Sequence, residues 1–313
     1  MADKIATREA YGNALAELGE KYDIVVLDAD LAEATKTLTF KKKFPDRFFD
    51  CGIAEGNMMG VAAGLATTGK IPFASTFAMF AAGRAFDQVR NSIGYPHLNV
   101  KIGATHAGLT VGEDGARHQC NEDIALMRTI PGMVILNPSD AIETRAAVEA
   151  AIKYNGPVYL RFGRYPVSII TDNPGYDFEI GKGIQMADGT DVTIVATGLM
   201  VEQALIAREK LAEEGISAAV INIHTIKPID KDLIIEAAKA TGAIVTAEEH
   251  NIIGGLGSAV AEVIGENYPI PVVRVGVEDK YGHSGKVPPL LEMYGLTPAN
   301  IVAKAKAAIA LKK

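Results

Sequence analysis

The segment GMVILNPSDAIETRAAVEAAIKYNGPVYLRF, residues 132–162, decides the fold class of this chain. Its two ends, GMVILNP and PVYLRF, are short β-rich runs. Between them, DAIETRAAVEAAIKY has the composition and length of a helix. Short and almost continuously apolar strands that are separated by helices are typical of a parallel sheet covered on both faces. The segment therefore predicts an α/β fold.

The same alternation extends over both halves of the chain. In the first half, DIVVLDAD (residues 23–30) and NVKIGAT (99–105) are predicted strands, and AEGNMMGVAAGLATTG (54–69) is a predicted helix that ends at a glycine. In the second half, the predicted strands are VTIVATG, AAVINIH, AIVTAEEH and PVVRVGV, and the predicted helices include LMVEQALIAREKLAEEG and PANIVAKAKAAIALKK.

Regularity lapses between residues 163 and 191, a stretch rich in Pro, Gly and Asp. We expect a linker there, with a short pair of strands. The predicted architecture is thus a first α/β domain at residues 1–168 with a mainly parallel sheet, a linker at 169–190, and a smaller α/β domain at 191–313.

Composition limits the classes of function. The 313 residues are 48% hydrophobic and 22% charged, with a net charge of -7, which argues against a nucleic-acid partner. The two cysteines form no CxxC motif, and no run of about 18 apolar residues predicts a membrane span. The first residues lack the apolar core of a signal peptide, so a cytoplasmic location is expected.

One glycine-rich loop gathers polar chemistry. THAGLTVGEDGARHQ (residues 105–119) holds His106, Asp114, Arg117 and His118. Glycines let the backbone approach a ligand closely, and acid with imidazole can bind hydroxyls and move protons near neutral pH. A solvated surface loop is the alternative. A metal site is disfavoured, because the loop has no His pair at i,i+4 and no His–Cys set.

Three further features are ambiguous by themselves. Glu55 is either a helix-start acid favoured by the helix dipole or a functional carboxyl group. Phe77 and Phe80, three residues apart, are either core residues or an aromatic platform for a cofactor. NIIGGLGSAV (residues 251–260) resembles a phosphate loop but lacks its spacing, so we expect a plain helix start with Ser258 as the N-cap.

An ordered set of motifs resembles the C-terminal half of transketolase over about residues 5–310. The motifs are DCGIAEGNMMGVAAGLA, STFAMF, THAGLTVGEDGARHQ, PSDAIE and LRFGRYP. The resemblance implies a pyrimidine-binding domain followed by the family's C-terminal domain, with thiamine diphosphate as the cofactor. It also implies transfer of a two-carbon ketol unit from a ketose phosphate to an aldose phosphate, a reaction of the pentose phosphate pathway.

The resemblance assigns the cofactor-binding positions to Glu55, Asp30, Ile53, Phe77 and Phe80. Glu55 is implied to be catalytic, because its carboxyl group hydrogen-bonds a ring nitrogen of the aminopyrimidine and promotes ylide formation. A buried, apolar setting is expected to keep this carboxyl group protonated. Phe77 and Phe80 correspond to the aromatic wall on which the pyrimidine lies, and a third family aromatic is replaced by Ala82 or Gly83.

Substrate-binding positions follow from the same resemblance. Asp114 and His118 correspond to residues that contact sugar hydroxyls, and His118 is also implied to be catalytic. Arg8, His106 and Arg161 correspond to phosphate-binding positions, a role for which the planar guanidinium is well suited. Ala34 stands where the family has a serine that also touches the phosphate.

The chain contains no Gly-Asp-Gly triplet, the family's metal and diphosphate motif. We therefore expect a companion N-terminal subunit that supplies the diphosphate site and the Mg2+ or Ca2+ ion, in a heterotetramer. No metal ligand is assigned to this chain. Alternatives are half of a deoxyxylulose-phosphate synthase, the beta subunit of a 2-oxo acid dehydrogenase, or a catalytically dead regulatory half.

Overall fold

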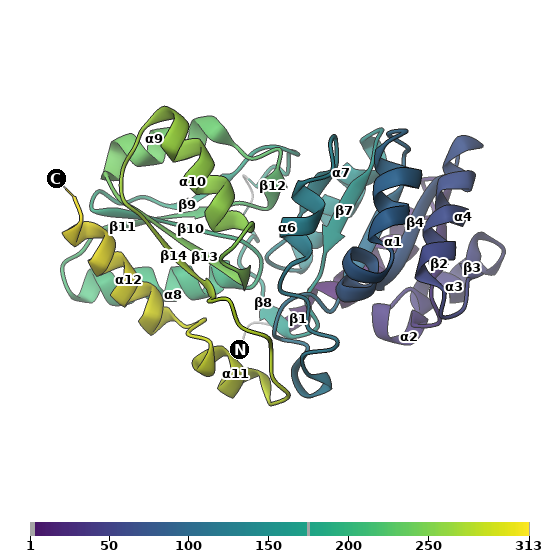
Figure 1. The fold of residues 1–313 in the computed structure, drawn as a ribbon, viewed down its shortest axis with the longest axis horizontal. Coiled ribbons are helices and arrows are strands. Elements are labelled where there is room, and N and C mark those ends of the chain that lie inside the picture. The colour runs from purple at the N-terminus through teal and green to yellow at the C-terminus, as the bar shows by residue number, and fades with distance from the viewer. Residues whose placement is uncertain (1–3, 174–175, 313) are drawn as a thin grey trace.

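The computed structural model describes residues 4–173 and 176–312, and confirms an α/β architecture with two main sheets and a separate two-stranded sheet. Two lobes lie side by side, and the chain passes from the first lobe to the second near the middle of the molecule (Figure 1). The described residues do not include residues 1–3 of the predicted first domain, residues 174–175 of the predicted linker or residue 313.

The larger sheet has seven strands in the order β12-β6-β7-β5-β4-β2-β3. Every neighbouring pair in it is parallel except β12 with β6, which is antiparallel. Its strands are β2 (Ile24–Asp28), β3 (Phe48–Asp50), β4 (Ile71–Phe77), β5 (Lys101–Thr105), β6 (Val134–Leu136), β7 (Val158–Arg161) and β12 (Thr225–Lys227). The central strands are buried along their whole length, as expected for a sheet covered on both faces.

Helices of the first lobe cover both faces of this sheet. One face packs against α1, α3 and α7, and the other against α4, η2 and α6. The helical segments are α1 (Thr7–Leu18), α2 (Ala32–Thr35), α3 (Leu38–Lys43), η1 (Pro45–Arg47), α4 (Glu55–Thr67), η2 (Phe80–Arg84), α5 (Phe86–Gln88), η3 (Val89–Gly94), η4 (Gly112–Asp114), α6 (Asp123–Arg128) and α7 (Ala141–Lys153).

The second lobe contains a five-stranded sheet in the order β14-β13-β10-β11-β9, parallel except for β9. Its strands are β9 (Ile184–Ala187), β10 (Val192–Ala196), β11 (Ala218–Asn222), β13 (Ile244–Asn251) and β14 (Val272–Val277). Its helices are α8 (Met200–Glu213), α9 (Lys231–Thr241), α10 (Leu256–Asn267), α11 (Val287–Met293) and α12 (Pro298–Ala310).

The expected pairing of two short strands between residues 163 and 191 is wrong. Both strands exist, but β8 (Pro166–Ser168) pairs with β1 (Lys4–Ala6), and β9 pairs with β11 in the second sheet. Each strand completes its hydrogen bonds on a longer-range partner, because a two-stranded hairpin alone is marginally stable. β9 therefore lies in the second sheet, although it falls inside the segment that we predicted as a linker.

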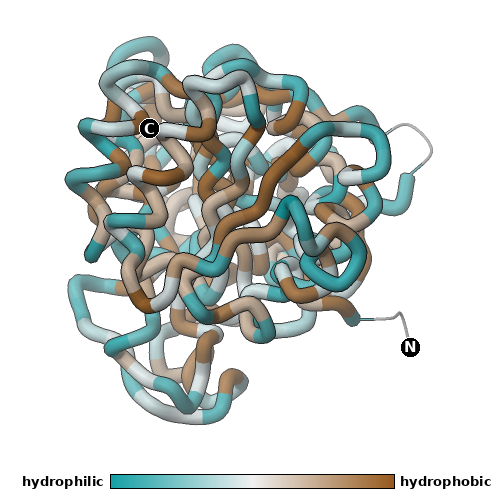
Figure 2. Tube along the Cα trace, turned by 90° about the vertical axis from the view of Figure 1, so that its right-hand side faces the viewer, coloured by the Kyte–Doolittle hydropathy of each residue, from teal (hydrophilic) through white to brown (hydrophobic). Residues whose placement is uncertain are grey.

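One hydrophobic core runs through both lobes. It joins side chains of α4, η2 and α6 in the first lobe to side chains of α9 and α10 in the second. The tube view shows hydrophobic stretches through the body of the molecule and hydrophilic stretches along many outer loops (Figure 2). None of the helices in the described part of the chain has the length and apolar character that a membrane crossing requires. The shared core packs the second lobe directly against the first.

Candidate active site

The predicted cofactor residues lie where parallel strands of the larger sheet end. Asp30 follows β2, Glu55 follows β3, Phe77 ends β4, and His106 follows β5 directly. In an open parallel sheet, ligands bind beyond the carboxyl ends of the strands. The topology therefore brings residues that are up to about 75 positions apart to the same edge of the sheet.

Glu55 is the first residue of α4, and only 2% of it is exposed. Its Oε1 accepts a hydrogen bond from Arg84 Nη1 at 2.7 Å. Its Oε2 is buried and has no hydrogen-bond partner among the described residues. The expected apolar setting is therefore wrong on one side, because a guanidinium group lies against the carboxyl group. The other carboxyl oxygen is a buried acceptor that lacks a donor among the described residues.

Aromatic rings line the space beside Glu55. Phe77 and Phe80 stack with their centroids 5.6 Å apart and their planes 14° apart. Arg84, at the end of the π-helical segment η2, lies with its guanidinium carbon 4.3 Å from the Phe80 centroid. Such π-helical turns are rare and are frequent at functional sites. Phe80 and Glu55 thus share one cationic partner.

His106 joins the aromatic group to the positive charges. Its ring stacks on Phe77 at a centroid distance of 3.7 Å, and His118 meets Phe77 edge-on at 6.1 Å. Arg8 Nη1 lies 3.0 Å from His106 Nε2, and Thr105 Oγ1 lies 2.9 Å from Nδ1. Since a guanidinium only donates, Nε2 accepts and the ring proton is on Nδ1. Burial lowers the pKa of His106 to about 3, so the imidazole is neutral at physiological pH.

Two guanidinium groups gather next to His106. Arg8 also donates to the backbone oxygen of Ala34 at 2.8 Å. Arg164 Nη1 donates to the Val111 oxygen at 2.5 Å, and burial together with the charge of Arg164 lowers the pKa of Arg8. Two guanidinium groups this close together form a local positive field within an acidic protein. Such a field suits an anion.

Arg161 does not belong to this group, contrary to the prediction that it binds phosphate there. Its Nε donates to Asp123 Oδ2 at 2.9 Å and its Nη2 to the Glu249 backbone oxygen at 2.9 Å. Only 4% of the Arg161 side chain is exposed. Arg161 is the last residue of β7 and faces the junction of the lobes, whereas Arg164 lies past the strand end. The sequence analysis missed Arg164, although both arginines stand in the quoted LRFGRYP motif.

The loop at residues 105–119 carries the predicted hydroxyl-binding residues. Asp114 is exposed at the end of η4, and His118 is half-buried with Nδ1 3.4 Å from the Asp114 backbone oxygen. Gly108, Gly112 and Gly115 have positive φ angles of 76°, 85° and 75°. The left-handed backbone at these glycines folds the loop back on itself, so Asp114 and His118 lie close together.

Asp30 and Ile53 lie at the rim of the site. Asp30 is exposed, with a φ of 61° and its N–H on Asp50 Oδ1 at 3.1 Å. Ile53 is 77% exposed just before α4. Asp28, which the sequence analysis did not single out, is buried beneath this rim, and burial raises its pKa to about 6. It accepts hydrogen bonds from the Thr35 and Thr37 hydroxyls at 2.7 and 2.8 Å and thereby holds the rim loop.

Ligands for a metal ion do not cluster in the described residues. Across residues 4–173 and 176–312, no three His, Cys, Asp or Glu side chains are arranged to hold an ion.

The sheet topology and the strand-end residues define an α/β protein with a cofactor site at the carboxyl edge of its first sheet. Comparison with protein-family models identifies that protein class. Residues 3–167 match the transketolase pyrimidine-binding domain, and residues 181–301 match the transketolase C-terminal domain. The chain belongs to the transketolase family, as the motifs predicted. Membership of these domain families implies dependence on thiamine diphosphate.

Curated relatives agree with this assignment. A Methanocaldococcus jannaschii protein, provisionally named a transketolase C-terminal section, is 53% identical over 300 residues, covering 95% of this chain and 94% of the relative. The 6-deoxy-6-sulfo-D-fructose transketolase subunit of a Clostridium species is 46% identical over 299 residues, covering 95% of this chain and 92% of the relative. Human transketolase is 40% identical over 301 residues, covering 95% of this chain but 48% of the human protein.

A solved structure described as a split gene transketolase, inactive beta4 tetramer, is 58% identical and has a TM-score of 0.92. The match covers 99% of this chain and 100% of that chain. The fold is thus shared over almost the whole chain with a split gene transketolase.

Proposed function

We propose that this chain is the C-terminal subunit of a two-chain transketolase. In this proposal it transfers a two-carbon ketol unit from a ketose phosphate to an aldose phosphate. The observation that carries the proposal is the buried Oε2 of Glu55, which has no partner in the described part of the chain, beside the stacked Phe77 and Phe80. A flat heterocycle with a ring nitrogen fits this pair of features. Its face can stack on the aromatic rings, and the nitrogen at its edge can form a hydrogen bond with the carboxyl group.

Thiamine diphosphate fits the residues present, and when bound it supplies an electron sink for the two-carbon fragment. Phe77 and Phe80 would hold the aminopyrimidine face, and Glu55 would hold a proton at its ring nitrogen. Arg84 now bonds Glu55 and covers Phe80, so we propose that its side chain swings away on cofactor binding. Asp30 and Ile53 are proposed to contact the cofactor from the rim.

Substrate recognition is proposed to fall to the loop at residues 105–119 and the neighbouring cations. Asp114 and His118 would bind sugar hydroxyls, with His118 near enough to the aromatic pair to move a proton at the reacting end. Arg8 and Arg164 would bind the phosphate. Neutral His106 accepts from Arg8 and so orients its guanidinium group toward the phosphate.

A companion subunit is part of the proposal. The chain spans about half of human transketolase and has no Gly-Asp-Gly motif. A companion would bring the diphosphate site and Mg2+ or Ca2+, in a heterotetramer. Support comes from the solved split gene relative, whose description calls a tetramer of its beta chain inactive. The cytoplasmic location stays a prediction.

Reconstitution tests this function. The chain alone, supplied with thiamine diphosphate, Mg2+ and a ketose phosphate–aldose phosphate pair, is expected to give no turnover. Addition of a separately purified N-terminal transketolase chain containing Gly-Asp-Gly is expected to give ketol transfer. Arg84→Ala serves as a control variant, because it removes the internal partner of Glu55 and should leave assembly intact. Turnover by this chain without any companion would refute the two-chain proposal.

A further inference from the structure

The loop at residues 105–119, which we call the substrate loop, belongs to the first lobe but rests on the second. Gln119 Nε2 donates to the His283 backbone oxygen at 2.9 Å. A Cβ at Gly115 would collide with the Ser284 hydroxyl group. The conformation of the loop is therefore not set by its own sequence alone.

Glu249, in β13 of the second lobe, makes the most buried of these contacts. Its Oε1 accepts the Thr110 backbone N–H at 2.6 Å, and only 4% of the residue is exposed. The carboxyl group lies against Gly108, where any Cβ would collide with it. Gly108 also has the positive φ of 76°. The turn at residues 108–110 is thus both shaped by glycine and held by a carboxylate of the other lobe.

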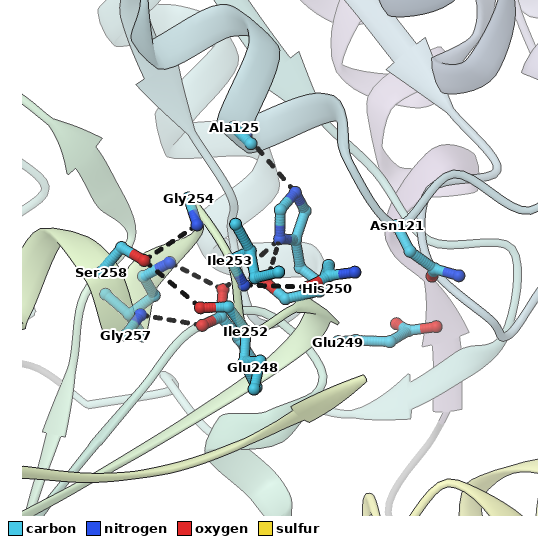
Figure 3. A network of polar contacts seen from close by, with 12 residues as sticks. Asn121, Ala125, Glu248, Glu249, His250, Ile252, Ile253, Gly254, Gly257 and Ser258 are labelled. Carbon is cyan, nitrogen blue, oxygen red and sulfur yellow. Dashed lines mark hydrogen bonds and ion pairs between the residues drawn. The ribbon is translucent and has the colours of Figure 1, made fainter. Parts of the chain in front are cut away.

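Its neighbour in the strand, Glu248, has a different task. Successive side chains of a strand point to opposite faces, and Glu248 turns toward the start of α10 (Figure 3). There it accepts the N–H groups of Leu256 and Gly257 at 2.6 and 2.8 Å. Of these two adjacent buried glutamates, Glu248 binds within the second lobe and Glu249 binds the substrate loop. A substitution of Glu248 therefore serves as a control for the same substitution of Glu249.

We infer that Glu249 is a positioning residue, through which the second lobe holds the substrate loop in the conformation that presents Asp114 and His118 to the sugar. The inference rests on the proposed function only for the identity of the ligand. Loss of the Glu249 acceptor oxygen would leave the Thr110 N–H without this hydrogen bond in a buried site, which costs free energy. The acceptor oxygen at full side-chain length, rather than the negative charge, is the property that matters.

Three substitutions separate the effect of the length of the Glu249 side chain from the effect of its charge. Glu249→Gln keeps the length and one acceptor oxygen, Glu249→Asp keeps the charge but withdraws the oxygens by one methylene, and Glu249→Ala removes both. Glu248→Asp is the matched control, since the same shortening there affects the α10 start instead. Hydrogen–deuterium exchange of the full-length chain, followed by mass spectrometry of peptides covering residues 105–119, reports loop opening without any need for activity.

We expect exchange in the substrate loop to accelerate roughly tenfold or more in Glu249→Asp and Glu249→Ala, and to change little in Glu249→Gln and Glu248→Asp. In the reconstituted enzyme, the first two variants should raise the KM for the ketose phosphate about tenfold and leave thiamine diphosphate affinity unchanged. Should Glu249→Ala fail to fold, the Asp and Gln variants carry the test.

Wild-type exchange in Glu249→Asp, or equal acceleration in the Gln and Asp variants, would overturn the positioning role. Absence of turnover in the wild-type complex would instead count against the proposed function, and the exchange result would stand independently of it.

Discussion

Glu55 shows how a single carboxyl group is prepared for a ligand. One oxygen is bonded to Arg84 and the other has no described partner in a buried position. A buried acceptor without a donor costs stability of about 1–3 kcal/mol. A residue that is kept in such a state is better explained by a bound partner than by a role in starting a helix.

Glu55→Gln is expected to leave the fold intact and to slow cofactor activation by at least about a hundredfold, because an amide cannot hold the ionisable proton at the ring nitrogen. The measurement is proton exchange at the thiazolium carbon of thiamine diphosphate in the reconstituted complex. An unchanged exchange rate would mean that Glu55 is only a helix-start acid.

Arg164 and Arg161 are predicted to behave differently although they are three residues apart. Arg164→Ala should raise the KM for phosphorylated sugars by roughly ten- to a hundredfold, because a charge-assisted contact contributes about 1.5–3 kcal/mol. Arg161→Ala should instead destabilise the fold by about 3–5 kcal/mol, because Asp123 would be left buried without its cation.

Kinetics with a phosphorylated sugar and its unphosphorylated counterpart, together with urea unfolding, check this pair of variants. Equal KM losses for both sugars in Arg164→Ala would disprove the phosphate contact.

Among the helices, α7 is preceded by a residue, Asp140, that caps the helix and also binds another segment of the chain. Asp140 is fully buried, and its Oδ1 accepts the Glu143 N–H at 2.9 Å. Its Oδ2 accepts the N–H groups of Ile170 and Thr171, both at 2.7 Å. One carboxylate thus ties a helix of the first lobe to the segment that leads toward the second.

Asp140→Ala is expected to cost about 3–5 kcal/mol of unfolding free energy, because it removes a helix cap and leaves buried donors unpaired. Thr297→Ala at the start of α12 is the matched comparison. Among residues 4–173 and 176–312, the Thr297 hydroxyl accepts one hydrogen bond, from the Asn300 N–H at 3.3 Å, so its loss should cost about 1 kcal/mol. Denaturant unfolding measures both, and similar losses would contradict the role of Asp140 in tying α7 to residues 170–171.

At the scale of the whole molecule, the two lobes share structure rather than merely touching. β12 follows β11 in the chain but pairs with β6 in the first sheet, and the largest core contains side chains from both lobes. His224 stands in the connection between β11 and β12, stacked on Phe178 at 4.1 Å. This junction gives the molecule a pH-sensitive point.

Burial lowers the pKa of His224 to about 4, against about 6.5 in the unfolded chain. Between these values the unfolded state binds the additional proton, so stability falls as the pH falls, by about 3 kcal/mol in all. Glu143, whose pKa burial raises to about 7, acts in the opposite direction, so wild-type data alone cannot isolate the histidine.

His224→Asn should therefore lose stability relative to wild type at pH 7 and regain much of that difference by pH 4.5. Unfolding free energies of the two proteins at pH 7 and pH 4.5 provide the comparison. A difference that does not vary with pH would show that His224 does not titrate in this window.

Local patterns could predict most of the elements, whereas the candidate site residues came from the resemblance to transketolase. Short apolar runs and helical stretches follow from residues that are near one another in sequence, and β2, α4 and α7 were found in this way. The N-cap of α10 was predicted wrongly at Ser258. The helix begins at Leu256, its first N–H groups bind Glu248 from another strand, and the Ser258 hydroxyl instead accepts the Gly254 N–H.

The sequence by itself determined the α/β class, the transketolase family and the strand-end residues, because periodicity and motifs are local properties. Only the tertiary structure decided that Arg164 rather than Arg161 lies beside Arg8, and that Arg84 bonds Glu55. It also decided that Glu249 contacts the substrate loop. These outcomes depend on strand direction, burial and contacts between residues up to about 140 positions apart, as from Thr110 to Glu249. Pairings at such distances are set by how the two lobes pack, which no short stretch of sequence encodes.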